Sequence, residues 1–146
     1  MPREDFVCAH RLRVRWAEVD MQKIVFNAHY LTYLDTAIAD YWRAIGLPYP
    51  DGYVERYGCD MFLRKATVEY LGSAQYDDEL EVLCRASRLG RSSLTFTFEV
   101  WREASAQLLA AELVYVNADP ASKTARALPD ELRARVKQFE KTEPAS

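Results

Sequence analysis

Glycine, histidine and cysteine are all scarce in this sequence of 146 residues. The five glycines are too widely spaced for a GxGxxG fingerprint or a P-loop, which excludes nucleotide-binding loops of those types. His10 and His29 are the only histidines, no serine lies in GxSxG, and no HExxH occurs, so a hydrolytic triad or a zinc site has little support. We expect no metal and no cofactor, which leaves carboxylates and backbone dipoles for any chemistry.

Three cysteines, Cys8, Cys59 and Cys84, are odd in number and far apart, so we expect neither a disulfide framework nor a CxxC pair. We predict that they are reduced and buried. The charged start lacks the apolar run of a signal peptide, and no segment approaches the roughly 20 apolar residues of a membrane span. These absences favour a cytoplasmic protein.

The formal net charge of -3 and the pI near 5.5 provide no general attraction to nucleic acid. Hydrophobic residues make up 49% of the chain and charged residues 28%, which is close to the globular average. A chain of this length buries roughly 70% of the surface that its unfolded form exposes. We therefore predict one domain over residues 1–146, with a core of its own.

The first third of the chain predicts a strand followed by a long helix. Apolar and charged residues alternate over residues 6–16, which indicates a half-buried strand. From Asn27 the apolar residues recur at three- and four-residue steps as far as Ile45, which predicts one helix. Asn27 is a suitable N-cap and Gly46 a suitable residue just past the end. On this helix Tyr33, Tyr41 and Trp42 fit the core better than a ligand pocket.

The rest of the chain predicts a short helix through Tyr57 and then four strands, over residues 60–71, 79–87, 92–102 and 108–116. A final short helix is predicted over residues 130–140. The connections are short and contain turn formers, so we expect consecutive strands to be antiparallel neighbours in a meander. We expect the last residues to be frayed. The predicted class is α+β, a curved antiparallel five-stranded sheet wrapped around one long helix.

One segment is more specific than these patterns. Residues 13–35 read RVRWAEVDMQKIVFNAHYLTYLD, in which Asp20, Ile24-Val25, Phe26-Asn27 and Tyr30 are spaced as in the 4-hydroxybenzoyl-CoA thioesterase-like family of hotdog-fold acyl-CoA thioesterases. The chain resembles this family more loosely through Tyr70 and residues 73–82 and 89–101. The resemblance implies a hotdog fold and an enzyme that hydrolyses acyl-CoA to a free acid and CoA, with CoA as part of the substrate.

The spacing of this segment also has a physical reason. Thioester hydrolysis needs a group that attacks or activates water, and donors aimed at the developing oxyanion. A helix N-terminus supplies free N–H groups and the positive end of the helix dipole. Because Asp20 lies a few residues before the predicted helix start, a loop could bring its carboxylate to that end.

By resemblance, Asp20 is the nucleophile or the general base, and N–H groups near Asn27 polarise the thioester carbonyl. His29 is a catalytic candidate or a solvent-facing residue at a subunit contact, and Asp20 could also be an ordinary turn-forming acid. The resemblance adds Val25, Phe26 and Tyr30 as substrate-binding residues. The chain departs from the family at two positions, since relatives often have His where this chain has Asn27 and Gly where it has Lys23.

The turn at Gly90 is the candidate for the CoA nucleotide, because its flanking residues Arg88, Arg91, Ser92 and Ser93 correspond to family positions near the nucleotide and pantetheine arm. Arginine can bind phosphate through paired donors. The alternative is an ordinary charged hairpin.

Two other functions stay open at this point. One is a dehydratase of the same fold, and the other is a module that binds an acyl thioester without hydrolysing it. The family also implies a homodimer that pairs again into a homotetramer, with sites at the subunit interface. The acyl group cannot be inferred from one sequence.

Overall fold

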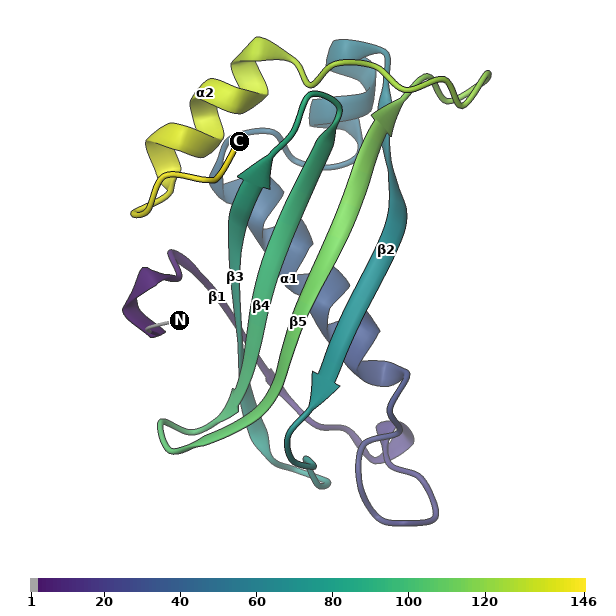
Figure 1. The fold of residues 1–146 in the computed structure, drawn as a ribbon. Coiled ribbons are helices and arrows are strands. Elements are labelled where there is room, and N and C mark those ends of the chain that lie inside the picture. Colours follow the sequence, from purple (N-terminus) through teal and green to yellow (C-terminus); the bar gives the residue numbers. More distant parts are fainter. Residues whose placement is uncertain (1–2) are drawn as a thin grey trace.

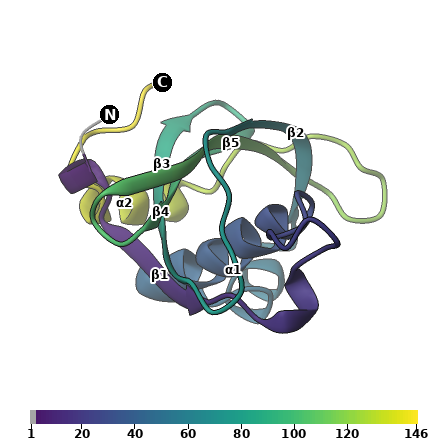
Figure 2. The ribbon, with the colours of Figure 1, turned by 90° about the horizontal axis from the view of Figure 1, so that it is seen from below.

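The computed structural model describes residues 3–146, and its central feature is an antiparallel sheet that curves around one long helix (Figures 1 and 2). This confirms the predicted α+β architecture. In chain order the elements are β1 (Cys8–Arg13), α1 (His29–Ala44), β2 (Asp60–Tyr70), β3 (Glu79–Leu89), β4 (Ser93–Arg102), β5 (Ala106–Ala118) and α2 (Asp130–Phe139). A short π-helical turn, Asp51–Glu55, occupies the place of the predicted short helix. No helix within residues 3–146 is both long and apolar enough to cross a membrane.

The order of strands across the sheet is β1-β3-β4-β5-β2, with every neighbouring pair antiparallel. The prediction of a meander is correct for β3, β4 and β5 and wrong for β2. That strand pairs with β5, so the connection over residues 71–78 crosses from one edge of the sheet towards the other. The prediction failed because turn formers show where a strand ends, whereas they do not show which strand it will join.

The first strand is shorter than predicted, since β1 ends at Arg13 and the chain then turns through a 3-10 segment, Trp16–Glu18. Trp16 is 74% exposed and does not continue the buried face of β1. The strand ends early because the Val14 N–H bonds the Asp78 carbonyl at 2.9 Å, outside the β1–β3 ladder. The released chain forms the loop that leads to α1.

Helix α1 ends as predicted and begins differently. At its end Gly46 has φ +80°, and the N–H groups of Gly46 and Leu47 bond the Arg43 and Trp42 carbonyls at 3.0 Å each. This is a Schellman motif. At its start the N-cap is Ala28, without any side-chain cap, so the predicted capping role of Asn27 is wrong.

The apolar face of α1 packs on the concave side of the sheet (Figure 2). Tyr33, Tyr41 and Trp42 are buried, which confirms their assignment to the core. All three cysteines are free and buried, as predicted.

The C-terminal segment is ordered and docked, contrary to the expected fraying. Glu140 follows α2, and its Oε2 accepts hydrogen bonds from the Tyr41 hydroxyl at 2.6 Å and the Ala86 N–H at 2.8 Å. Ala145 then exchanges backbone bonds with the end of β3, at Ser87 and Leu89. The segment is ordered because β1 leaves this edge of β3 unpaired beyond Cys84, and the tail fills it.

Candidate active site

Glu18 anchors the loop between β1 and α1. Its Oε1 accepts hydrogen bonds from the Arg15 N–H and the Tyr33 hydroxyl, each at 2.8 Å, and its Oε2 pairs with the Arg15 guanidinium at 2.8 Å. Burial alone would raise the pKa of this carboxyl, but the bonds from Arg15 and Tyr33 outweigh burial and lower it. Glu18 is therefore held as a carboxylate, and the loop is fixed to the side of α1.

Asp20 lies at the next bend of this loop. Val19 bridges Val25, and the Asp20 N–H bonds the Ile24 carbonyl at 3.0 Å, so the chain doubles back on itself. The Asp20 Oδ1 accepts the Gln22 N–H at 2.8 Å, while its other oxygen has no hydrogen bond within residues 3–146. Lys23 has φ +65°, a left-handed conformation that glycine adopts most easily.

The same loop leads directly into the start of α1. The Phe26 N–H bonds the Glu18 carbonyl at 2.9 Å, and the His29 N–H bonds the Phe26 carbonyl at 2.9 Å. Between them the N–H groups of Asn27 and Ala28 have no partner in the described part of the chain. Two unpaired donors at a helix N-terminus are a site at which negative charge is stabilised.

The other sequence candidates at this end differ in exposure. Phe26 is 45% exposed, and its ring meets that of His29 edge-on, with centroids 5.9 Å apart. Val25 and Tyr30 are buried, and the Tyr30 hydroxyl accepts the Ala74 N–H at 3.0 Å, so Tyr30 ties α1 to the segment before β3. The fold thus places Asp20, Asn27 and His29 around one end of α1, although no direct contact joins Asp20 to either of the other two.

The turn at Gly90 lies at the opposite end of the sheet (Figure 1). It follows β3, an eleven-residue strand whose length is about 36 Å. Arg88 and Arg91 are exposed and have no ion pair among residues 3–146. The Arg133 guanidinium bonds the Arg91 carbonyl at 3.1 Å and also the Gly90 carbonyl, so α2 holds the turn in place. Within one chain, Arg88, Arg91, Ser92 and Ser93 do not reach Asp20.

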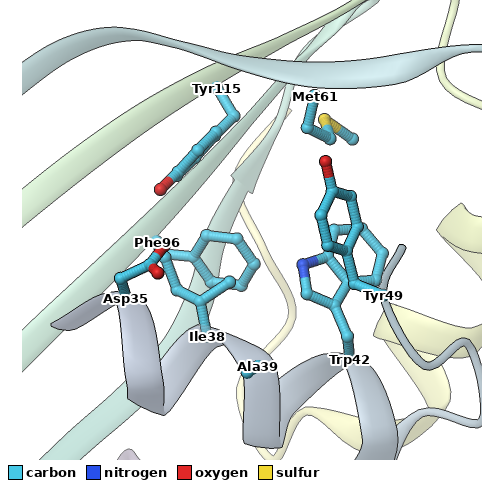
Figure 3. A pocket seen from close by; sticks show the side chains of 8 residues that line it. All are labelled: Asp35, Ile38, Ala39, Trp42, Tyr49, Met61, Phe96 and Tyr115. Carbon is cyan, nitrogen blue, oxygen red and sulfur yellow. The ribbon is translucent and has the colours of Figure 1, made fainter. Parts of the chain in front are cut away.

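A cavity of about 240 Å³ lies between α1 and the sheet, and Figure 3 shows its lining. Its walls come from α1, the segment after α1, and strands β2, β4 and β5; they are Asp35, Ile38, Ala39, Trp42, Tyr49, Met61, Phe96 and Tyr115. Sequence reasoning did not find this group because its members are distant in the chain and share no motif. Of the three helix aromatics that the sequence assigned to the core, Tyr33, Tyr41 and Trp42, only Trp42 lines this cavity.

Comparison with known proteins now assigns the fold and the enzyme class. The chain is 30% identical to the acyl-CoA thioester hydrolase YbgC of Escherichia coli over 87% of this chain and 93% of that protein. A hypothetical protein of Aquifex aeolicus (AQ1494) has a similar structure, with a TM-score of 0.80, 27% identity and coverage of 88% of this chain and 98% of that one. A Staphylococcus aureus protein (SAV2348) solved with CoA shares the fold at a TM-score of 0.82 and 14% identity, over 94% of this chain and 86% of that one.

The sequence pattern of one family covers more than half of the chain. It matches residues 22–108 and is described as the thioesterase superfamily, 4HBT; Asp20 lies two residues before the match begins. With the arrangement of strands and helices above, this confirms the predicted hotdog fold. The chain belongs to the thioesterase superfamily and is a thioester hydrolase.

Proposed function

We propose that the chain hydrolyses an acyl-CoA to a free acid and CoA, with the Asp20 carboxylate as nucleophile or general base. The observation that carries the proposal is the pair of unpartnered N–H groups at Asn27 and Ala28, beside the loop that holds Asp20. Similarity to YbgC and to a fold found with CoA supports the substrate class.

The chemistry follows from these groups. N–H groups at the start of α1 would donate to the thioester carbonyl oxygen and stabilise it as it becomes an oxyanion. As a nucleophile, Asp20 would attack the carbonyl carbon, release the CoA thiolate and form an anhydride that water hydrolyses. As a general base, it would take a proton from the attacking water. Phe26 and His29 would flank the thioester, with Val25 and Tyr30 behind them.

The CoA nucleotide would bind at Arg88, Arg91, Ser92 and Ser93 of a second copy, because these residues lie at the far end of the same chain. Edge strand β2 supports such an assembly, since only β5 pairs with it and its Leu63 is 53% exposed. We therefore propose a homodimer that assembles into a homotetramer, and light scattering should detect at least a dimer. A monomer at working concentration would contradict this part of the proposal.

Replacing Asp20 with asparagine tests the catalytic role. The asparagine side chain would keep an oxygen for the Gln22 N–H, so the loop should persist while the carboxylate is lost. We expect kcat to fall by about 10² to 10⁴-fold for release of free CoA from a panel of acyl-CoAs. A thiol reagent suits the assay because the three cysteines are buried.

Asp51→Asn provides the matched control, since it makes the same change at an exposed position beyond the other end of α1. Its kcat should equal that of the wild type. Full activity in Asp20→Asn would refute the role of Asp20. Binding of acyl-CoA by the wild type without release of thiol would favour a binding module instead.

A further inference from the structure

The cavity behind α1 has a closed floor and an open rim. Trp42 and Phe96 form the floor and are 3% and 1% exposed, whereas Asp35 and Tyr49 at the rim are exposed (Figure 3). Its volume of about 240 Å³ exceeds that of an apolar cavity that holds benzene, roughly 150 Å³. It is smaller than pockets for drug-sized ligands, roughly 300 Å³ and above. The cavity therefore fits one compact group.

Aromatic rings supply most of its walls. Trp42 comes from α1, Tyr49 from the segment after it, Phe96 from β4 and Tyr115 from β5. The Phe96 ring meets those of Trp42 and Tyr115 at 74° and 81°, with centroids 6.5 and 6.1 Å apart. The Trp42 and Tyr49 rings are tilted by 33°, with centroids 6.1 Å apart, so the four rings line the cavity at different angles. The faces of aromatic rings attract cations, and cages of this kind bind quaternary ammonium groups.

The charges around the cavity are negative. Asp35 points into it, and its carboxylate has no hydrogen bond or ion pair within residues 3–146 (Figure 3). Burial, and then the charge of Asp35, raise the pKa of Tyr115 to about 12. A second carboxylate, Asp60, accepts a hydrogen bond from the Tyr49 hydroxyl. No lysine or arginine is among the residues that line the cavity. A cationic group in the cavity would gain an ion pair with Asp35, and a neutral apolar group would not.

We propose that the cavity binds the cationic end of the acyl group, so that the preferred substrates are acyl-CoAs carrying a substituted ammonium. The rings of Trp42, Phe96 and Tyr115 would surround the cation and the Asp35 carboxylate would pair with it. Asp35 lies six residues after His29, about 9 Å along the helix from its start. An ammonium on about the seventh carbon of an extended acyl chain suits that distance. The inference rests on the proposed acyl-CoA hydrolysis.

A pair of substrates with the same shape and different charge tests it. The first is 7-(trimethylammonio)heptanoyl-CoA, and the second is 8,8-dimethylnonanoyl-CoA, in which carbon replaces the nitrogen. We expect the wild-type kcat/KM to favour the cation by about tenfold or more. Asp35→Asn should bring the ratio close to one, mainly through a loss of kcat/KM for the cationic substrate. Asp51→Asn should leave the ratio unchanged. A wild-type ratio of one or less, or a ratio that Asp35→Asn does not alter, overturns the inference.

Binding of the two free acids separates this inference from the proposed function. If no acyl-CoA of the panel is hydrolysed, these two included, the hydrolysis proposal fails. Calorimetry with 7-(trimethylammonio)heptanoate and 8,8-dimethylnonanoate then still decides whether the cavity binds a cation. Tighter binding of the cationic acid, lost in Asp35→Asn, supports the cage. Equal binding of the two acids, or tighter binding of the neutral one, overturns it.

Discussion

The two ends of helix α1 are built in opposite ways. At its C-terminal end Gly46 and Leu47 satisfy two carbonyls, and the Arg135 guanidinium donates to the Ile45 carbonyl at 2.8 Å. At its N-terminal end no side chain caps the helix, and the N–H groups of Asn27 and Ala28 have no partner within residues 3–146. An absent N-cap costs about 1 kcal/mol. We call the C-terminal end of α1 the closed end, since it stabilises the fold. We call the N-terminal end the open end, since under the proposed function its free N–H groups bind the substrate.

Two buried glutamates, Glu140 and Glu18, also differ between the two ends of α1. Glu140, near the closed end, lies between α1 and β3 and has a pKa raised by burial, against the lowering effect of its bonds from Tyr41 and Ala86. Glu18, at the open end, has a lowered pKa and fixes the loop that carries Asp20. One carboxylate therefore belongs to the packing of the core, and the other positions the candidate site.

Among changes at the two ends of α1, the largest expected effect comes from Ala28→Pro, which removes one of the two free N–H groups. The φ of Ala28 is -68°, close to that of proline, so the helix start should tolerate the ring. We expect kcat to fall by about 10² to 10³-fold, with little change in melting temperature. Ala28→Ser keeps the N–H and should keep the activity. A folded Ala28→Pro variant with normal kcat would show that this N–H is not an oxyanion donor.

Tyr41→Phe tests the closed end. Its hydroxyl donates to the buried Glu140, so the substitution leaves a carboxylate oxygen with one donor fewer. Urea unfolding should show that the free energy of unfolding falls by about 2 to 3 kcal/mol, while kcat at 25 °C stays near the wild-type value. The matched control is Tyr57→Phe, because Tyr57 donates to the more exposed Glu131 and should matter much less. If the two variants lose equal free energy of unfolding, burial of the acceptor carboxylate does not decide the strength of the bond.

Glu18→Gln tests the open end through pH. Because the pKa of Glu18 is lowered below its ordinary 4.5, its contribution to stability is present above that value and lost as pH falls through the lowered pKa. At pH 7 we expect the variant to be about 1 to 2 kcal/mol less stable than the wild type, with a lower kcat from a loosened loop. The difference in stability should shrink in acid when thermal unfolding is followed against pH. A constant difference would mean that the carboxylate charge plays no part.

These contrasts also explain what the sequence could predict. The extent of α1 followed from local periodicity, and its C-terminal end from Gly46, since both signals lie within a few residues. The N-cap at Ala28 and the absence of a side-chain cap are recorded in no local pattern of the sequence. Pairing of β2 with β5 depends on the whole sheet. The approach of the Asp20 loop to the helix start was predictable because the two are only a few residues apart.

The cavity was beyond prediction for the same reason. Asp35, Tyr49 and Tyr115 belong to three separate elements, and each looks ordinary in its own segment. Only the curvature of the sheet over α1 brings them together.

The smallest expected effect is at Gly46, where alanine would take a left-handed conformation at φ +80°. Gly58 at φ +67° provides the control, because a Cβ there meets nothing within 4 Å, whereas at Gly46 it would lie 2.5 Å from an Arg135 nitrogen. Gly58→Ala should cost about 1 kcal/mol by urea unfolding, from backbone strain alone. Gly46→Ala should cost somewhat more, because Arg135 must move and release the Ile45 carbonyl. Equal costs would show that Arg135 adjusts freely. A change of kcat in Gly46→Ala and not in Gly58→Ala would mean that the two ends of α1 are coupled.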